Sequence, residues 1–134
     1  MLENNKIVVI GGGHAGIEAA LAIQKKGYNC TLVIMNKEAI GRLSCNPAIG
    51  GLAKGHLVRE LDALGGVMGL VADKTTLQHK VLNKSKGRAV WSPRSQVDKI
   101  KYTKKIQKII FNTKKIQIVE DEVIDFEIKK NKVS

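Results

Sequence analysis

The chain has 134 residues, enough for one domain, and its 43% hydrophobic content is ordinary for a packed globular protein, which argues against a disordered chain. No stretch reaches the roughly 18 consecutive apolar residues that a membrane span needs, so we expect a soluble, cytoplasmic protein without a membrane partner. The formal charge of +11 favours a polyanionic partner, although the excess of lysine over arginine is equally well explained by drift in composition.

The first part of the chain, residues 1–36, has the pattern of a strand, a helix and a second strand. Residues 6–10 form a continuous β-branched run, as expected of a parallel strand that is buried on both faces. Residues 15–26 favour a helix, and Gly27 stands where a left-handed cap is needed. A second apolar run at residues 31–35 completes a βαβ unit of about thirty residues.

Residues 37–91 are punctuated by glycines, which indicates a long insertion. One helix is predicted at about residues 52–64, where leucines recur at helical spacing, and the remainder is expected to be loop and short turns. Loops of this length inside compact domains are usually functional.

The last part, residues 92–134, begins with a predicted helix. Ser92 suits the N-cap and Pro93 suits the first helical position, so the helix is expected to start there. An apolar stripe is predicted to pack on the sheet, with lysines on the remaining surface; the stripe consists of Tyr102, Ile106, Ile109 and Ile110.

A third strand is predicted at residues 116–119, and residues 124–128 alternate as in a half-exposed antiparallel strand. Asn131 suggests a hairpin turn, with an unfinished returning strand from Val133. In a doubly wound sheet the first strand lies in the middle, so three strands alone leave it as an open apolar edge. The predicted fold is therefore α/β, an incomplete, partial Rossmann-like (doubly wound) domain with a long glycine-rich insertion.

The strongest chemical signal is the GxGxxG pattern directly after the first strand, which we call the glycine loop. It consists of Gly11, Gly12, Gly13, His14, Ala15 and Gly16. The first glycine makes the turn, the second admits a pyrophosphate to the backbone, and the third lets helix and strand pack closely. Free amides at the start of the helix would then bind the diphosphate of a dinucleotide. A structural turn that matches by chance is the alternative interpretation.

Asn36 stands where dinucleotide-binding proteins often carry an acidic residue for the ribose. Its amide can still hydrogen-bond a hydroxyl, but without a charge. The glycine loop alone leaves both FAD and NAD open as ligands.

Cys45 and Cys30 do not have the spacing of a redox pair or a zinc site. A thiolate can act as a nucleophile where positive surroundings lower its pKa, whereas a buried cysteine is inert. Three histidines without metal-site spacing and the acidic residues 120–122 do not predict a metal site.

Four segments carry a resemblance that covers nearly the whole chain. They are IVVIGGGHAGIEAA at residues 7–20, SCNPAIGGLAKGHLVRELDALGG at 44–66, LNKSKGRAV at 82–90 and SPRSQVDKIKY at 92–102. In this order and wording they closely resemble the MnmG (GidA) family of tRNA-modifying flavoproteins.

The resemblance implies an enzyme that installs an aminomethyl-type group, such as carboxymethylaminomethyl, on C5 of the wobble uridine of tRNA. Family members use FAD, reduced by NADH, and take the carbon from methylene-tetrahydrofolate; they are homodimers that work with an MnmE-type GTPase. By this resemblance the glycine loop holds the FAD diphosphate, Val123 offers its backbone to adenine, and Cys45 is catalytic near the flavin. The chain corresponds to an N-terminal portion, so we expect it to be inactive alone.

Two other functions stay open. A flavin-dependent disulfide oxidoreductase would use Cys45 but needs a partner thiol, and none is spaced correctly. A non-catalytic nucleotide- or RNA-binding module would use the lysine-rich residues 99–115. Tyr102 is the one aromatic residue among the closely spaced lysines from 99 to 108, so base stacking would contribute little there.

Overall fold

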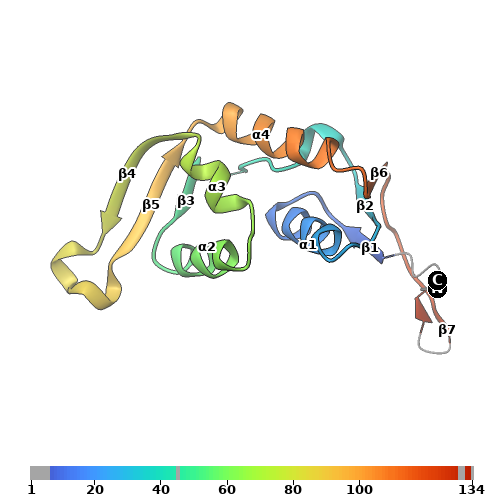
Figure 1. The fold of residues 1–134 in the computed structure, drawn as a ribbon, viewed down its shortest axis with the longest axis horizontal. Coiled ribbons are helices and arrows are strands. Elements are labelled where there is room, and N and C mark those ends of the chain that lie inside the picture. The colour runs from blue at the N-terminus through green and yellow to red at the C-terminus, as the bar shows by residue number, and fades with distance from the viewer. Residues whose placement is uncertain (1–6, 45, 130–131, 134) are drawn as a thin grey trace.

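The computed structural model describes residues 7–44, 46–129 and 132–133. Across these ranges the chain forms an elongated arch with a parallel sheet at one end and an antiparallel sheet at the other (Figure 1). Helix α4 (Lys99–Phe111) runs along the top between the two sheets, and α1 (His14–Lys25) lies beneath it. One hydrophobic core, with side chains from both sheets and both helices, connects the two ends.

The parallel sheet contains three strands within the described residues, in the order β1, β2, β6. They are β1 (Ile7–Ile10), β2 (Cys30–Ile34) and β6 (Ile116–Glu120), and their β-branched residues suit a pleated, buried surface. Both pairings are parallel, so β2 lies in the centre and β1 at the edge. This is the first half of the doubly wound strand order, and the predicted α/β fold is confirmed.

β1 differs from the prediction in its burial. Val8 and Ile10 are 51% and 61% exposed, whereas Ile7 and Val9 pack against the core. The reason is that successive side chains point to opposite faces of a strand, and α1 covers one face of this sheet. The prediction that this strand is buried on both faces is therefore wrong for the described residues.

Helix α1 agrees with the prediction at both ends to within a residue. It ends at Lys25, Lys26 is its C-cap, and Gly27 follows with φ of +90°. Only glycine adopts that conformation without strain from a Cβ atom, so it stops the helix as expected.

Helix α4 starts later than predicted. Its N-cap is Asp98, whose side chain accepts hydrogen bonds from the backbone N–H groups of Ile100 and Lys101 at 3.1 and 3.0 Å. Ser92 and Pro93, which were expected to start the helix, belong instead to the strand β5 (Ser92–Val97).

Pro93 is tolerated inside an antiparallel sheet because of where its backbone points. Its carbonyl accepts from the N–H of Gly51 at 3.0 Å, on the side of β3 (Ala48–Gly50). The N–H and C=O of one residue in an antiparallel strand point to the same side, so the N–H that proline lacks would also have pointed towards β3. β3 ends there, and the proline therefore removes one bond at the end of the ladder.

The insertion contains more regular structure than predicted. β4 (Thr76–Leu82) and β3 both pair with β5, and the described strands of this antiparallel sheet have the order β3, β5, β4. The predicted helix is α2 (Lys54–Ala63), and a second helix, α3 (Met68–Asp73), follows it. Three short 3-10 turns complete the segment: η1 (Lys37–Ala39), η2 (Lys84–Lys86) and η3 (Arg88–Val90). The prediction that the insertion contains one helix and is otherwise loop and short turns is therefore wrong.

The C-terminal hairpin is confirmed in part. β7 (Ile128–Lys129) pairs antiparallel with β8 (Lys132–Val133), and the predicted turn residue Asn131 lies outside the described residues. Residues 121–127 form no helix or strand, so the strand predicted from residue 124 is wrong except at its end. Ile124 is 90% exposed, and a strand without a neighbour has no ladder to stabilise it.

A buried carboxylate connects α1 to the insertion. Glu18 is 8% exposed, and its Oε1 accepts from the backbone N–H groups of Val67 and Met68 at 2.9 and 2.7 Å. These are orphan donors at the start of α3, so Glu18 caps a helix that its own N-cap side chain does not cap.

We predict that Glu18→Ala lowers the free energy of unfolding by about 1–3 kcal/mol, because it removes charge-assisted bonds and leaves buried N–H groups without acceptors. Urea denaturation measures this change. Glu122→Ala, at an exposed position after β6, is the matched control and should change the midpoint little. Equal midpoints for both variants would mean that the cap does not stabilise the fold.

Candidate nucleotide-binding site

The glycine loop joins the carboxyl end of β1 to the start of α1. Gly11 has φ of +99°, and its N–H donates to the carbonyl of Val33 in β2 at 2.8 Å. A Cβ atom at Gly16 would collide with the carbonyl oxygen of Gly11, so the helix can pack on the loop only because residue 16 has no side chain. The first and third glycines of the motif therefore have the roles that the sequence predicted.

The middle glycine faces open space. Gly13 is the N-cap of α1 with extended backbone (φ −73°, ψ 177°), and a Cβ atom built there would meet nothing within 4 Å. The first helical bond runs from the N–H of Ile17 to the carbonyl of Gly13 at 3.0 Å. The four N–H groups of Gly13, His14, Ala15 and Gly16 therefore have no acceptor within the helix.

This helix start suits an anion. In the described part of the chain, α1 has no side-chain cap and no acidic residue in its first turn. Unpaired N–H groups and the positive end of the helix dipole together attract phosphate groups. The loop thus fits the diphosphate of a dinucleotide in space, hydrogen-bonding capacity and charge.

The rest of the loop is fixed from the side of the insertion. The carbonyl of Gly12 accepts from the N–H of Gly41 at 3.0 Å, and a Cβ atom at Gly12 would lie 3.0 Å from Cγ2 of Ile34. The segment that leads towards Cys45 is thereby hydrogen-bonded to the glycine loop.

Asn36 lies two residues beyond the end of β2, close to the predicted position. Its Oδ1 accepts from the N–H of Glu38 at 2.7 Å and caps the turn η1. A carboxylate lies nearby, because Glu120 at the end of β6 is the register partner of Ile34 in β2. Glu120 accepts from the N–H of Lys37 at 2.9 Å and pairs with its ammonium group at 3.6 Å.

Parallel pairing explains why Glu120 was missed: strand ends that are about 85 residues apart meet at one edge of the sheet, which no local pattern reports. Val123, the residue expected near adenine, lies three positions beyond β6 and is 39% exposed. The segment before it starts beside β2, where the N–H of Asp121 donates to the carbonyl of Ile34 at 2.8 Å.

Half-buried His14 and buried Tyr102 form a pair behind the loop. Their ring centroids are 5.7 Å apart, and Nε2 of His14 and the hydroxyl of Tyr102 are buried without a hydrogen-bond partner among the described residues. Burial, and then the charge of Lys54, lower the pKa of His14. Burial, and then the charge of Glu18, raise the pKa of Tyr102. Both side chains are therefore neutral at pH 7.

Of the two cysteines, the structure describes Cys30. Cys45, the predicted catalytic residue, lies outside the described residues. Cys30 is 4% exposed, its Sγ lies 3.8 Å from the carbonyl oxygen of Ala20, and burial raises the pKa of its thiol. A raised pKa keeps the thiol protonated, so Cys30 is a structural residue.

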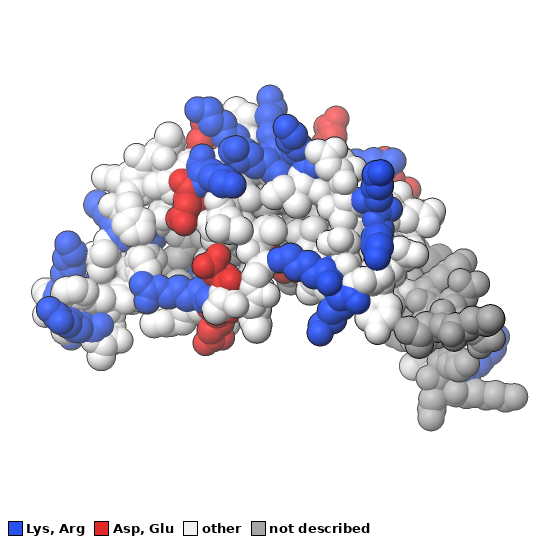
Figure 2. Space-filling view, viewed as in Figure 1, with Lys and Arg blue, Asp and Glu red and all other residues white. Residues whose placement is uncertain are grey.

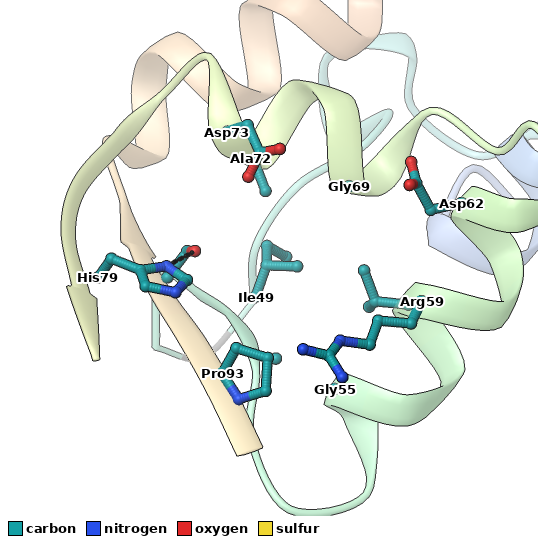
Figure 3. Close-up of a pocket in the computed structure, with 12 residues that line it drawn as sticks. Ile49, Gly55, Arg59, Asp62, Gly69, Ala72, Asp73, His79 and Pro93 are labelled. Atoms are coloured by element: carbon teal, nitrogen blue, oxygen red, sulfur yellow. Dashed lines mark hydrogen bonds between the residues drawn. The ribbon is translucent and has the colours of Figure 1, made fainter. Parts of the chain in front are cut away.

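A separate cavity of about 270 Å³ lies in the insertion, between α2, α3 and the antiparallel sheet (Figure 3). Arg59 and Asp62 of α2 border one side, and His79 of β4 borders the other, where its Nδ1 lies 2.9 Å from Oγ of Ser95. This cavity is not part of the glycine loop. The described residues contain no cluster of three or more His, Cys, Asp or Glu that suits a metal, and no helix among them is long and apolar enough to cross a membrane.

A parallel sheet whose first strand leads through a glycine loop into a helix is the arrangement of the Rossmann-type fold, the class of fold that binds dinucleotides in other proteins. The chain belongs to the family described as Glucose inhibited division protein A, whose model matches residues 6–134. The resemblance that the sequence motifs carried is thus confirmed.

Individual relatives agree with this assignment. The tRNA uridine 5-carboxymethylaminomethyl modification enzyme MnmG of Aquifex aeolicus is 52% identical over 133 residues, which are 99% of this chain and 22% of that protein. The enzyme of the same name from Sulfurihydrogenibium is 56% identical over 94% of this chain and 20% of its own length. The chain therefore spans about a fifth of the curated relatives that it matches.

Solved structures show the same relationship. The structure of Aquifex aeolicus GidA matches with a TM-score of 0.89 and 52% identity, over 96% of this chain and 21% of that one. Klebsiella pneumoniae HpxO, solved in complex with FAD and uric acid, matches with a TM-score of 0.57 and 17% identity, over 99% of this chain and 35% of that one. The second likeness concerns the fold alone.

We predict that the chain loses stability as the pH falls below about 6.5, because His14 is harder to protonate in the folded than in the unfolded chain. The unfolded state then binds more protons than the folded state. The free energy of unfolding therefore decreases as the pH is lowered, until the pH is below the lowered pKa of His14. Thermal denaturation between about pH 5 and pH 7.5 measures this slope.

His14→Gln should reduce that slope, whereas His56→Gln, at an exposed position, should keep the slope of the unchanged chain. If the two variants have the same pH dependence, the buried environment of His14 does not control its protonation.

Proposed function

We propose that the chain is the FAD-binding part of an MnmG-type enzyme that modifies C5 of the wobble uridine in tRNA. The observation that carries this proposal is the start of α1, where four backbone N–H groups lack helical acceptors beside an open position at Gly13. Family membership and the names of the relatives, tRNA uridine 5-carboxymethylaminomethyl modification enzymes, support the reaction class.

The diphosphate of FAD would bind at the N–H groups of residues 13–16, where the helix dipole stabilises its charge. Neutral His14 lies behind these amides and adds no positive charge, so the backbone N–H groups and the helix dipole would supply the attraction. The absence of a side chain at Gly13 lets phosphate oxygens reach the backbone. When bound, FAD supplies the redox chemistry; the described residues bind and orient it.

The adenosine half would lie over the carboxyl ends of β2 and β6. Asn36 would contact the ribose through its side-chain NH₂, because its Oδ1 already caps η1. Glu120 offers a carboxylate at the same edge, and the backbone of Val123 is the expected partner of adenine. Together, these residues would supply polar contacts that the uncharged Asn36 alone lacks.

We further propose that Cys45 is the catalytic nucleophile, close to the flavin. Cys30 is buried and cannot serve as the second thiol of a disulfide oxidoreductase, which leaves the modification enzyme as the better proposal. NADH as reductant, methylene-tetrahydrofolate as carbon donor, a homodimer, an MnmE-type GTPase partner and a cytoplasmic location belong to the proposed function of the whole enzyme.

Gly13 offers a sharp test, because a side chain added there would occupy the proposed diphosphate position without contacting other atoms of the protein. Gly13→Ala should weaken FAD binding at least tenfold, since its methyl group points into the open position, and should lower stability by less than about 1 kcal/mol. Gly13→Ser should weaken FAD binding while stabilising the fold by a few tenths of a kcal/mol, because its hydroxyl caps α1. Flavin fluorescence and thermal denaturation measure the two effects.

Gly16→Ala is the comparison, since its methyl group collides with the backbone of Gly11 and should destabilise the fold itself. Unchanged FAD affinity in both Gly13 variants would contradict binding of the diphosphate at this loop.

A further inference from the structure

Helix α4 presents lysines on the side that faces away from the core. Its inner side is fixed by Tyr102, Ile106 and Ile110, each at most 1% exposed. At 100° per residue, four exposed lysines fall on the opposite side within about a third of a turn. We call them the α4 lysine surface: Lys101, Lys104, Lys105 and Lys108.

This surface is part of a broader basic region. Figure 2, which has the orientation of Figure 1, shows lysine and arginine side chains gathered along the top of the molecule, over α4. The net charge of +11 is therefore not spread evenly over the view shown.

The charges of the α4 lysine surface are close together and mostly uncompensated. Each of its lysines has two others three or four residues away, about one helical turn, and these like charges repel one another. Among the described residues, only Lys101 of the four forms an ion pair, at 3.5 Å with Asp98. An anionic partner would remove this repulsion.

We propose that the α4 lysine surface binds the phosphate backbone of RNA. This inference rests on the proposed function, in which the chain acts on tRNA. Lysine ammonium groups bind phosphates as point charges, and the release of counterions from RNA then favours binding without reading the sequence. Tyr102 is buried and cannot stack on bases, so the contact is to the backbone.

The packing of α4 favours RNA over a membrane. A basic amphipathic helix binds lipid by inserting its apolar face between the headgroups. That face of α4 is already packed in the core through Tyr102, Ile106 and Ile110. The exposed large apolar side chains of α4 are Ile100 and Phe111, which lie at opposite ends of the helix and do not form an apolar face. The lysines between them suit a polyanion in solution.

The proposed RNA contact and the cofactor site use opposite sides of α4. The ring of Tyr102 faces His14 behind the glycine loop, whereas the lysines point away from the core. Binding of RNA and binding of FAD should therefore be separable by substitution.

The test uses the full chain and a fluorescently labelled, unmodified tRNA transcript, with anisotropy measured at about 50 to 300 mM KCl. The test variant is K101Q/K104Q/K105Q/K108Q. The control variant, K26Q/K74Q/K80Q/K84Q, removes the same charge from exposed lysines that belong to other elements. Circular dichroism and flavin fluorescence report whether each variant keeps its helices and its FAD affinity.

The test variant should bind tRNA at least tenfold more weakly at about 100 mM KCl, and the slope of log K against log salt should fall by about three. The control should change both quantities much less, and FAD affinity should stay the same in both. Equal weakening by the two variants would show a nonspecific effect of net charge and would overturn the proposal, as would no weakening by the test variant.

Vesicles that contain phosphatidylserine distinguish the membrane alternative. A test variant that loses vesicle binding but keeps tRNA binding would overturn the RNA proposal. Failure of the cofactor proposal would look different: a chain that binds tRNA through these lysines but does not bind FAD would contradict only the function proposed for the glycine loop.

Discussion

The contact between Gly16 and the carbonyl of Gly11 is the constraint on which the site depends. With no Cβ atom at residue 16, α1 can start directly at the end of β1 and pack on the loop that precedes it. Its first four N–H groups, which have no acceptor within the helix, then follow the carboxyl end of β1. An anion at this position meets several donors at once, and the fold provides them without any charged side chain.

Two polar side chains of α1 couple this helix to the insertion and to α4. Glu18 caps α3, and His14, one turn earlier, packs on Tyr102 of α4. Residues one turn apart lie on the same side of a helix, so one side of α1 contacts both the insertion and α4. The backbone bond between Gly41 and Gly12 adds a second connection. The glycine loop, α4 and the described start of the insertion are therefore connected through α1 and the loop before it.

Local patterns predicted the elements that local forces determine. β1, α1 and β2 follow from apolar periodicity and glycine positions, and the glycine loop has the predicted geometry. The predicted start of α4 was wrong. Ser92 and Pro93 suit the start of a helix locally, but the pairing of β5 with β3 and β4 places them in a strand. The same long-range pairing hid the antiparallel sheet within the insertion. The site was predicted less completely, since Glu120 reaches the edge beside Asn36 only through the pairing of β2 with β6.

The proposed function requires that backbone amides at the start of α1 hold the diphosphate of FAD. Amide NMR of the ¹⁵N-labelled chain tests it most directly, because each N–H group reports its own hydrogen bond. On addition of FAD, we expect the largest shifts at Gly13, His14, Ala15 and Gly16, with smaller changes at the ends of β2 and β6. Saturable binding of FAD that leaves these four amide signals in place, while amides of the insertion cavity shift instead, would contradict it.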